Sequence, residues 1–511
     1  MAIIGSIIKK VIDVTGSITN DDTSVKENQL EVLKELLEKA KDTSFGKFYN
    51  FSIILESEDV IKTFQERVPY FDYHQLNERW WQQLHEGSED ITWPGSPDYY
   101  ALSSGTTGKT SKRIPVTQDM IDSIRQAGIK QVAALSNFDL PPDFFEKEIM
   151  MLGSSTNLQE REGHLEGEIS GISASNIPFW FKGYYKPGED IAKIDDWDER
   201  VEHIAKNAKS WDIGALSGIP SWMELMLKKV IAHHKVENIH EVWPNLLVYT
   251  SGGVAFQPYE KSFNALLGKP ITVIDTYLAS EGFIAFQNRP DTESMKLITD
   301  NGIFFEFVPF QPDYINQDGS LKQEAPVVSI EDVEEDVDYV LLMSTVSGAW
   351  RYIIGDTIAF TDKEKSEIKI TGRTKFFLNV VGSQLSVNKM NDAIKELEDI
   401  YDIQLPEFTV GAVKIDNEFY HQWYLGSDSE LSIDEEELAN KLDESLKNAN
   451  KNYKVARGKA LKGIKVSVLP LKAFYEWSGA NKKKGGQVKM EKVMKEEKLK
   501  EFEEFVNKHK F

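Results

Sequence analysis

A polar, glycine-containing stretch, S-S-G-T-T-G-K-T-S-K at residues 103–112, has the composition of a phosphate-binding loop. Its end matches a P-loop, but that motif requires a glycine five positions before Gly108, where this chain has Ser103. The two glycines leave backbone N–H groups uncovered, the hydroxyls donate hydrogen bonds, and Lys109 or Lys112 supplies positive charge. The stretch is therefore a candidate polyphosphate loop, with a polar hairpin tip as the alternative.

Three further segments carry groups suited to a nucleotide and its metal. In T-Y-L-A-S-E-G-F, Glu281 is suited to Mg²⁺ and Tyr277 to packing on a purine; a turn with an exposed acid is the alternative. In W-R-Y-I-I-G-D, Asp356 follows a glycine at the end of an apolar strand. A carboxylate there accepts two hydrogen bonds from ribose hydroxyls or forms an Asx-turn. In Y-T-S-G-G, residues 251–253 let the backbone approach a ligand closely.

Composition narrows the class of protein. The 511 residues carry a formal net charge of −23, which argues against a nucleic-acid partner, because phosphate backbones require a basic surface. The absence of cysteine excludes disulfides, thiolate metal sites and an acyl thioester on the enzyme. The histidines at 233, 234 and 240 are interpreted as a solvated helix end. With no apolar run of about 18–20 residues and no secretory signal pattern, a cytoplasmic enzyme without a membrane partner is expected.

These candidate residues require an α/β framework to position them. Apolar spacing predicts helices at residues 24–42, 72–83, 117–135 and 487–511. Strand–turn–strand patterns lie at 269–286 and 338–362. The pattern predicts a large α/β domain at residues 1–376 and a smaller α+β domain at 377–511.

Taken in order, five motifs resemble those of adenylate-forming enzymes: S-S-G-T-T-G-x-x-x-K, W-P-N…S-G-G, Y-x-A-S-E, R-Y-x-x-G-D and G-R-T. The sequence is most similar to the acyl acid amido synthetases of the auxin-responsive Gretchen Hagen family. The likeness runs from V-P-Y-F-D-Y-H-Q-L-N-E-R-W to G-G-Q-V-K-M-E-K-V. The position of Gly108, and Ile353 where the plant members have arginine, resemble the bacterial branch. The resemblance implies a large N-terminal adenylate-forming domain of β-barrel and α/β sheets, with a small C-terminal lid.

The resemblance also implies roles for individual residues. The implied ATP site consists of Ser103, Ser104, Gly105, Thr106, Thr107, Ser251, Gly252, Gly253, Thr276, Tyr277, Glu281, Asp356 and Arg373. Glu281 would approach Mg²⁺, Asp356 would hold the ribose, and Arg373 would lie near the hinge of the lid. Lys489, in the Q-x-K segment, would reach the α-phosphate, which makes Lys489 and Glu281 the implied catalytic residues. The lysines at 482–484 lie in the same loop and are interpreted as a solvated basic run.

The implied reaction is ATP-dependent and AMP-forming. A small carboxylic acid would be adenylated and its acyl group passed to an amine, an amino acid being the expected acceptor. An acyl-coenzyme A ligase is the alternative within adenylate chemistry, and a nucleotide sensor that has lost catalysis is the alternative outside it. Ser103 disfavours a P-loop ATPase or GTPase. The identities of the acid and of the amine are not readable from these motifs.

Overall fold

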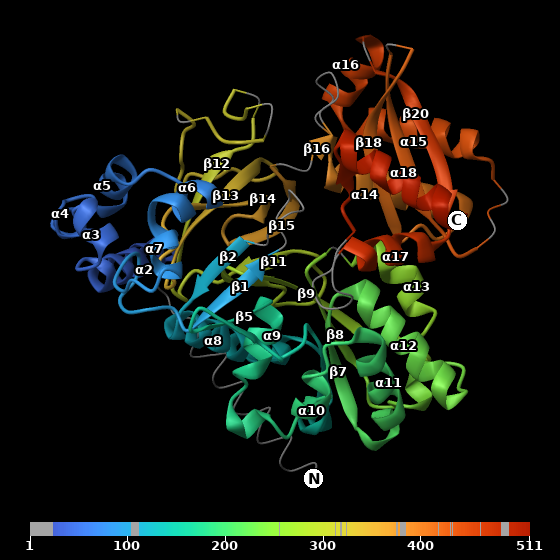
Figure 1. The fold of residues 1–511 in the computed structure, drawn as a ribbon, viewed down its shortest axis with the longest axis horizontal. Helices are drawn as coiled ribbons and strands as arrows, with labels where there is room; N and C mark the ends of the chain where they lie inside the picture. The colour runs from blue at the N-terminus through green and yellow to red at the C-terminus, as the bar shows by residue number, and fades with distance from the viewer. Residues whose placement is uncertain are drawn as a thin grey trace. The chain divides into compact units, whose positions relative to one another are not determined.

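The computed structural model describes residues 24–511, apart from short gaps. The gaps are residues 104–111, 255, 312, 317–318, 323, 375–376, 379–384, 417, 430, 432, 460 and 482–489. The chain forms two compact units. The first comprises Met1–Gly253, Leu267–Tyr314 and Gln323–Ile370, and the second comprises Val254–Leu266, Ile315–Lys322 and Thr371–Phe511 (Figure 1).

An eleven-stranded sheet forms the framework of the first unit, and it mixes parallel and antiparallel strands. Its strand order is β12 (Ile303–Pro309), β13 (Asp338–Thr345), β14 (Tyr352–Asp362), β15 (Glu367–Arg373), β11 (Met295–Leu297), β10 (Gly282–Phe286), β9 (Thr272–Ala279), β8 (Val248–Gly252), β7 (Ile213–Gly218), β3 (Glu148–Leu152) and β6 (Tyr185–Lys186). A four-stranded sheet has the order β2 (Lys112–Val116), β1 (Tyr99–Ser103), β5 (His164–Gly167) and β4 (Gln159–Arg161). The α/β character predicted from the sequence is confirmed.

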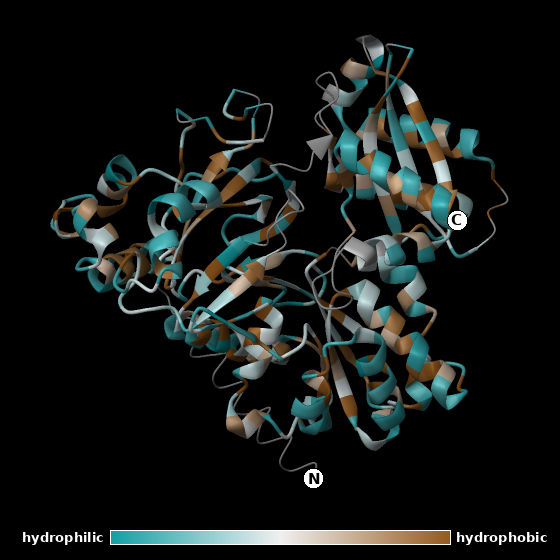
Figure 2. Cartoon of the chain, viewed as in Figure 1, coloured by the Kyte–Doolittle hydropathy of each residue, from teal (hydrophilic) through white to brown (hydrophobic). Residues whose placement is uncertain are grey.

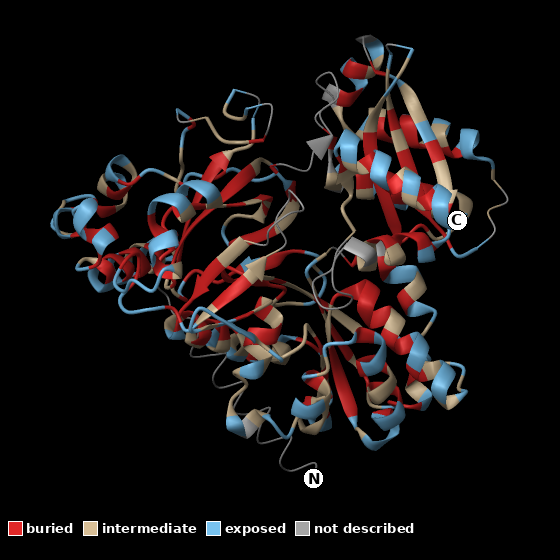
Figure 3. Cartoon of the chain, in the orientation of Figure 1, coloured by how far each residue is buried: buried red, intermediate tan, exposed pale blue. Residues whose placement is uncertain are grey.

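Helices cover these sheets because one side of each helix is apolar. Figure 2 shows hydrophobic residues concentrated on the strands, and Figure 3 shows that the same strands are buried while the helices keep an exposed side. The helices of the first unit are α2 (Val25–Ala40), α3 (Ser44–Phe48), α4 (Phe51–Leu55), α5 (Val60–Arg67), α6 (Tyr73–Leu76), η1 (Asn77–Trp81), α7 (Gln82–His85), α8 (Gln118–Ala134), η2 (Leu135–Asn137), η3 (Pro142–Glu146), α9 (Ile169–Ser175), η4 (Phe179–Phe181), α10 (Glu189–Ala192), α11 (Trp197–Asn207), η5 (Ala208–Ser210), α12 (Pro220–His234) and η6 (Ile239–Glu241). Among the described residues, no helix combines the length and apolar composition needed to span a bilayer.

Helix α2 illustrates how local sequence and packing agree. Ser24 and Glu27 form a capping box at its start, so two otherwise unpaired N–H groups are satisfied. The buried Gln29 side chain then joins the helix to β12, donating to the Ile303 carbonyl (3.0 Å) and accepting from the Phe305 N–H (2.7 Å). The helix predicted at 24–42 is therefore both capped and fixed to the edge of the large sheet.

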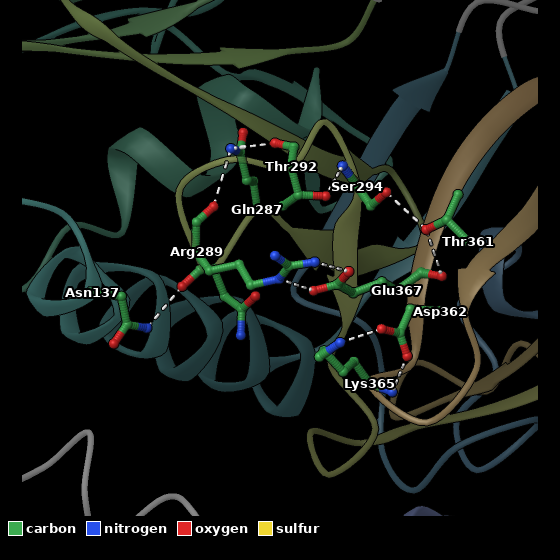
Figure 4. A network of polar contacts seen from close by, with 10 residues as sticks. Asn137, Gln287, Arg289, Thr292, Ser294, Thr361, Asp362, Lys365 and Glu367 are labelled. Carbon is green, nitrogen blue, oxygen red and sulfur yellow. Dashed lines mark hydrogen bonds and ion pairs between the residues drawn. The ribbon is translucent and has the colours of Figure 1, made fainter.

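The C-terminal end of β14 is fixed by a network of polar contacts shown in Figure 4. The Arg289 guanidinium makes two parallel hydrogen bonds to the buried Glu367 carboxylate, at 2.7 and 2.9 Å. The Thr361 hydroxyl donates to the Ser294 hydroxyl at 2.7 Å. Because a bidentate pair constrains both position and orientation, this network fixes β14 and β15 against the loop that joins β10 to β11.

The second unit is a small α+β structure. Its main sheet has the order β20 (Leu461–Leu469), β19 (Glu418–Gly426), β18 (Glu407–Ile415) and β21 (Val493–Met494), beside a short hairpin of β16 (Phe377–Leu378) and β17 (Leu385–Ser386). Its helices are η7 (Gln257–Tyr259), α13 (Glu260–Asn264), α14 (Val387–Tyr401), α15 (Glu435–Ala449), α16 (Lys451–Lys459), α17 (Leu471–Asn481) and α18 (Glu496–His509). One apolar core joins the sheet to α14, α15 and α16, and another joins it to α17 and α18.

His421, on β19, is a buried titratable group in the first of these cores. It is fully buried, and neither ring nitrogen has a hydrogen-bond partner among the described residues. Burial, assisted by the nearby Arg457 charge, lowers the pKa of His421 to about 3, although Asp443 acts in the opposite direction. The folded chain therefore keeps this imidazole neutral at pH values where the unfolded chain protonates it.

Stability is accordingly expected to fall below about pH 6.5, the ordinary histidine pKa, because the unfolded state then binds one more proton. Between pH 7.5 and pH 5 this group removes about 2 kcal/mol of unfolding free energy. Urea unfolding of the full chain and of His421→Phe at both pH values measures the effect. The wild type should lose more stability than the variant by about that amount; parallel pH profiles would contradict the prediction.

Candidate active site

The candidate phosphate loop is the connection of a β-hairpin. Strands β1 and β2 are antiparallel, and the pair of residues next to their connection is Ser103 and Lys112. The predicted site residues at 104–107 lie outside the described residues. Ser103 and Lys112, both partly exposed, are the described residues on either side of residues 104–111.

Lys112 reaches into a group of tyrosines. Its ammonium nitrogen lies 3.4 Å from the Tyr352 hydroxyl oxygen and 5.4 Å from the centre of the Tyr73 ring. Since the electron-rich face of an aromatic ring attracts a cation, the two tyrosines hold the end of this side chain. Lys112 was one of two suggested sources of charge for the loop, and its contacts with these tyrosines make it a candidate site residue.

Glu281 lies in the tight turn between β9 and β10, where Ala279 pairs with Gly282. It is only 5% exposed, which contradicts the alternative of an exposed acid in a turn. Burial raises the pKa of the Glu281 carboxyl, while the Lys112 charge and a hydrogen bond with Tyr352 lower it. The carboxyl group is therefore held in a desolvated position beside a cation and a phenol.

Asp356 does not lie at the end of a strand, as predicted, but in the middle of β14. The pairing of β13 with β14 shifts between Val340 and Leu342, and Gly355 there has a φ of 93°. Such a bulge re-aims the following side chain, and the positive φ favours glycine. Asp356 is buried, and the Tyr277 hydroxyl donates a hydrogen bond to its Oδ2 atom.

A second group of predicted residues lies where parallel strands end. Ser251 and Gly252 of β8 pair with the β9 residues Asp275 and Thr276, and the Thr276 hydroxyl donates to the Ser251 carbonyl at 2.9 Å. A Cβ atom on Gly252 would lie 2.8 Å from the Thr276 hydroxyl, so this close approach requires glycine. Gly253 follows with a φ of 85°. The carboxyl ends of parallel strands are a common place for nucleotides to bind.

The structure brings together five side chains from distant parts of the chain. They are Lys112, Tyr277, Glu281, Tyr352 and Asp356. Their arrangement around Glu281 is further indicated by its electrostatic interaction with Asp356, which raises the pKa of the Glu281 carboxyl. Thr276 adjoins this group because it precedes Tyr277 on β9.

Tyr352 is the member of the group that sequence reasoning missed. It begins β14 four residues before Asp356 and is fully buried. Burial and the neighbouring Glu281 carboxyl raise the pKa of the Tyr352 phenol well above its usual value. Its place at the start of R-Y-x-x-G-D was the available signal, but nothing in the motif indicates which way the ring points.

Two further predicted residues are Arg373 and Lys489. Arg373 ends β15 and is exposed, in the second unit. Lys489 lies outside the described residues. The contributions of both to a nucleotide site remain predictions.

The group also bears on the predicted Mg²⁺. Within the described parts of the chain, no cluster of three or more aspartate, glutamate or histidine side chains is arranged to hold a metal. Proteins usually bind Mg²⁺ through one or two carboxylates together with substrate phosphates and water. The buried carboxyl group of Glu281, beside the Lys112 charge, fits that form of site.

Comparison with known proteins identifies the family of the chain. Sequence models of the GH3 family match in chain order: its N-terminal domain at residues 15–201, its central domain at 296–373 and its C-terminal domain at 387–498. An indole-3-acetic acid-amido synthetase, GH3.2 of Arabidopsis thaliana, is 25% identical over 237 residues, 43% of each chain. The match therefore spans less than half of that relative's length.

Solved structures share the fold over nearly the whole chain. The GH3.15 acyl acid amido synthetase superposes with a TM-score of 0.78 at 16% identity, covering 97% of this chain and 96% of the other. A 2-hydroxyisobutyryl-CoA ligase, in complex with 2-HIB-AMP, superposes with a TM-score of 0.59 at 12% identity, covering 95% and 93%. The bacterial branch remains a prediction, but three successive domain matches over most of the chain decide the family: this protein belongs to the GH3 family.

Proposed function

We propose that this protein is an ATP-dependent acyl acid amido synthetase. It adenylates a small carboxylic acid and transfers the acyl group to an amine, an amino acid being the expected acceptor, with release of pyrophosphate and AMP. One observation carries the proposal: five side chains from segments far apart in sequence converge in the first unit. They are Lys112, Tyr277, Glu281, Tyr352 and Asp356. Family membership and the shared fold support it.

ATP would be held by groups from several segments. The phosphates would lie against residues 103–107, and Lys112 would supply positive charge where that loop ends. The Asp356 carboxylate would accept hydrogen bonds from the ribose hydroxyls, with Tyr277 and Thr276 near the adenine. Backbone at 251–253 would border the adenine or the acyl pocket.

The chemistry follows from the weakness of a carboxylate as an electrophile, since its leaving group would be oxide. A carboxylate oxygen attacks the α-phosphorus, an O–P bond forms, the α–β phosphoanhydride breaks and pyrophosphate leaves. The amine nitrogen then attacks the acyl carbon, a C–N bond forms, the bond to AMP breaks and the nitrogen loses a proton. Mg²⁺, when bound, neutralises charge on the phosphate oxygens.

Two residues would act on the first step. Glu281 would provide the carboxylate for Mg²⁺, and Lys489 would stabilise charge that builds on the α-phosphate. The lid proposed at residues 377–511, with Arg373 near its hinge, would exclude water from the acyl adenylate.

Acid-dependent exchange of pyrophosphate into ATP tests the proposal. A panel of acids is first screened for exchange, and each active acid is then paired with a panel of amino acids while AMP is measured. Exchange with little AMP release until an amino acid is added would support the synthetase. Consumption of coenzyme A instead would identify the acyl-coenzyme A ligase, and no exchange with any acid would favour a sensor without catalysis.

Glu281→Gln tests the metal assignment. The amide keeps the shape of the side chain but removes the charge, so the Mg²⁺ concentration that gives half-maximal exchange should rise about tenfold. Glu293→Gln is the matched control, because that carboxylate is exposed and pairs with Lys369 at 3.0 Å. Identical Mg²⁺ titrations of wild type and Glu281→Gln would remove Glu281 from the metal site.

A further inference from the structure

The ring of Tyr352 is held rigidly by its surroundings. The backbone of Phe71 forms hydrogen bonds with the residues on both sides of Tyr352. The Phe71 N–H donates to the Arg351 carbonyl (3.0 Å), and the Phe71 carbonyl accepts from the Ile353 N–H (2.8 Å). The Tyr352 ring packs against the Trp81 ring, with centres 5.8 Å apart. A side chain fixed at both backbone and ring loses little further freedom when it orients a partner, as precise sites require.

The Arg351 side chain adds to this rigidity. Its guanidinium is buried and pairs with the equally buried Glu306, at 2.9 Å between Nε and Oε2. It also donates to the Gln65 carbonyl at 2.9 Å. Both partners of the ion pair are satisfied by defined contacts, so the start of β14 has one arrangement rather than several.

The hydroxyl of Tyr352 lies between two charged groups, and their chemistry fixes the direction of each hydrogen bond. The Lys112 ammonium, 3.4 Å away, carries only donors, so the phenol oxygen accepts from it. The Tyr352 hydroxyl also forms a hydrogen bond with the Glu281 carboxyl, which lowers the pKa of Glu281 and raises that of Tyr352, so the single phenol proton is donated to the carboxyl oxygen. Tyr352 thus connects the cation at the base of the phosphate loop with the buried carboxylate of the β9–β10 turn.

We propose that Tyr352 is a positioning residue, whose hydroxyl orients the Glu281 carboxylate toward a divalent cation and separates it from Lys112. Without the hydroxyl, the Lys112 ammonium, whose charge already acts on the Glu281 carboxyl, would pair with it directly, and that ion pair would withdraw both groups from the ligand. This inference rests on the proposed function, because it assigns Glu281 to the metal of an ATP site. Groups that orient a metal ligand in this way commonly affect metal affinity or activity about 10- to 100-fold.

Tyr352→Phe tests the inference, because it removes the hydroxyl and keeps the ring. ATP binding is measured by calorimetry with and without Mg²⁺, and exchange is measured across a Mg²⁺ titration. We expect the variant to bind ATP without Mg²⁺ as the wild type does. It should lose most of the gain in affinity that Mg²⁺ confers and require about tenfold more Mg²⁺ for half-maximal exchange.

Tyr73→Phe is the matched control. The Tyr73 hydroxyl accepts from the Arg113 N–H (3.0 Å), and its ring lies beneath the same Lys112 ammonium. Its removal is therefore expected to leave the Mg²⁺ dependence unchanged. Melting curves report whether each variant is folded.

A double-mutant cycle with Glu281→Gln separates positioning from general stability. If Tyr352 acts through Glu281, the two substitutions together should raise the Mg²⁺ requirement by much less than the product of their separate effects. The inference would be overturned if folded Tyr352→Phe kept the Mg²⁺ dependence of the wild type, or if the two substitutions had multiplicative effects. In either case the proposed function would stand, provided that the wild type is active. A wild type that neither exchanges pyrophosphate with any acid nor binds ATP more tightly with Mg²⁺ would overturn both.

Discussion

Replacing Asp356 by alanine is expected to weaken ATP binding about 100-fold, because two charge-assisted hydrogen bonds to the ribose are lost. The carboxylate is buried on the bulge of β14, and its Oδ2 atom already accepts one hydrogen bond from the Tyr277 hydroxyl. A preorganised acceptor of this kind needs no rearrangement when the nucleotide binds. The apparent ATP constant in the exchange assay, checked by calorimetry, measures the effect.

Asp362→Ala is the control for this substitution. Asp362 ends the same strand, is partly exposed and pairs with Lys365, as Figure 4 shows. Removal of the Asp362 side chain should change neither the apparent ATP constant nor the rate of pyrophosphate exchange. Asp356→Asn, which retains one acceptor oxygen, should have an intermediate effect. An ATP constant that is unchanged in folded Asp356→Ala would refute the ribose contact.

Replacing Lys489 by alanine is expected to slow adenylation at least about 100-fold, with ATP affinity changed by only a few-fold. Charge increases on the α-phosphate oxygens as the carboxylate attacks, so an ammonium directed at them stabilises the transition state more than bound ATP. Loss of one such preorganised contact typically costs about 3 kcal/mol. Single-turnover formation of the acyl adenylate measures the rate apart from product release.

The lysines at 482, 483 and 484 supply the controls for Lys489. Each lies in the same segment, and each substitution by alanine should leave adenylation within a few-fold of the wild type. A near-normal rate in Lys489→Ala together with a strong loss in one of these variants would transfer the role to that lysine. Loss of ATP binding in parallel with the rate would instead indicate a contact already made in the ground state.

Local sequence was sufficient for much of the fold. The helix predicted at 24–42 is present as α2, and Thr117 caps α8 with a hydrogen bond to the Met120 N–H. These features depend on apolar spacing and on side-chain to backbone hydrogen bonds within a few residues. Asp356 was predicted at the end of its strand but lies within β14 at a bulge, because a bulge depends on pairing with β13, which no local pattern shows.

By itself, the sequence determined the family, the α/β class and the segments that carry Glu281, Asp356 and the candidate phosphate loop, because motif order and residue type are properties of the chain. The tertiary structure decided that Glu281 is buried rather than exposed in its turn, and that Tyr277 of β9 donates to Asp356 of β14. It alone placed Tyr352 between Lys112 and Glu281. Burial and hydrogen bonding between distant segments depend on sheet register and packing, which no local pattern of residues specifies.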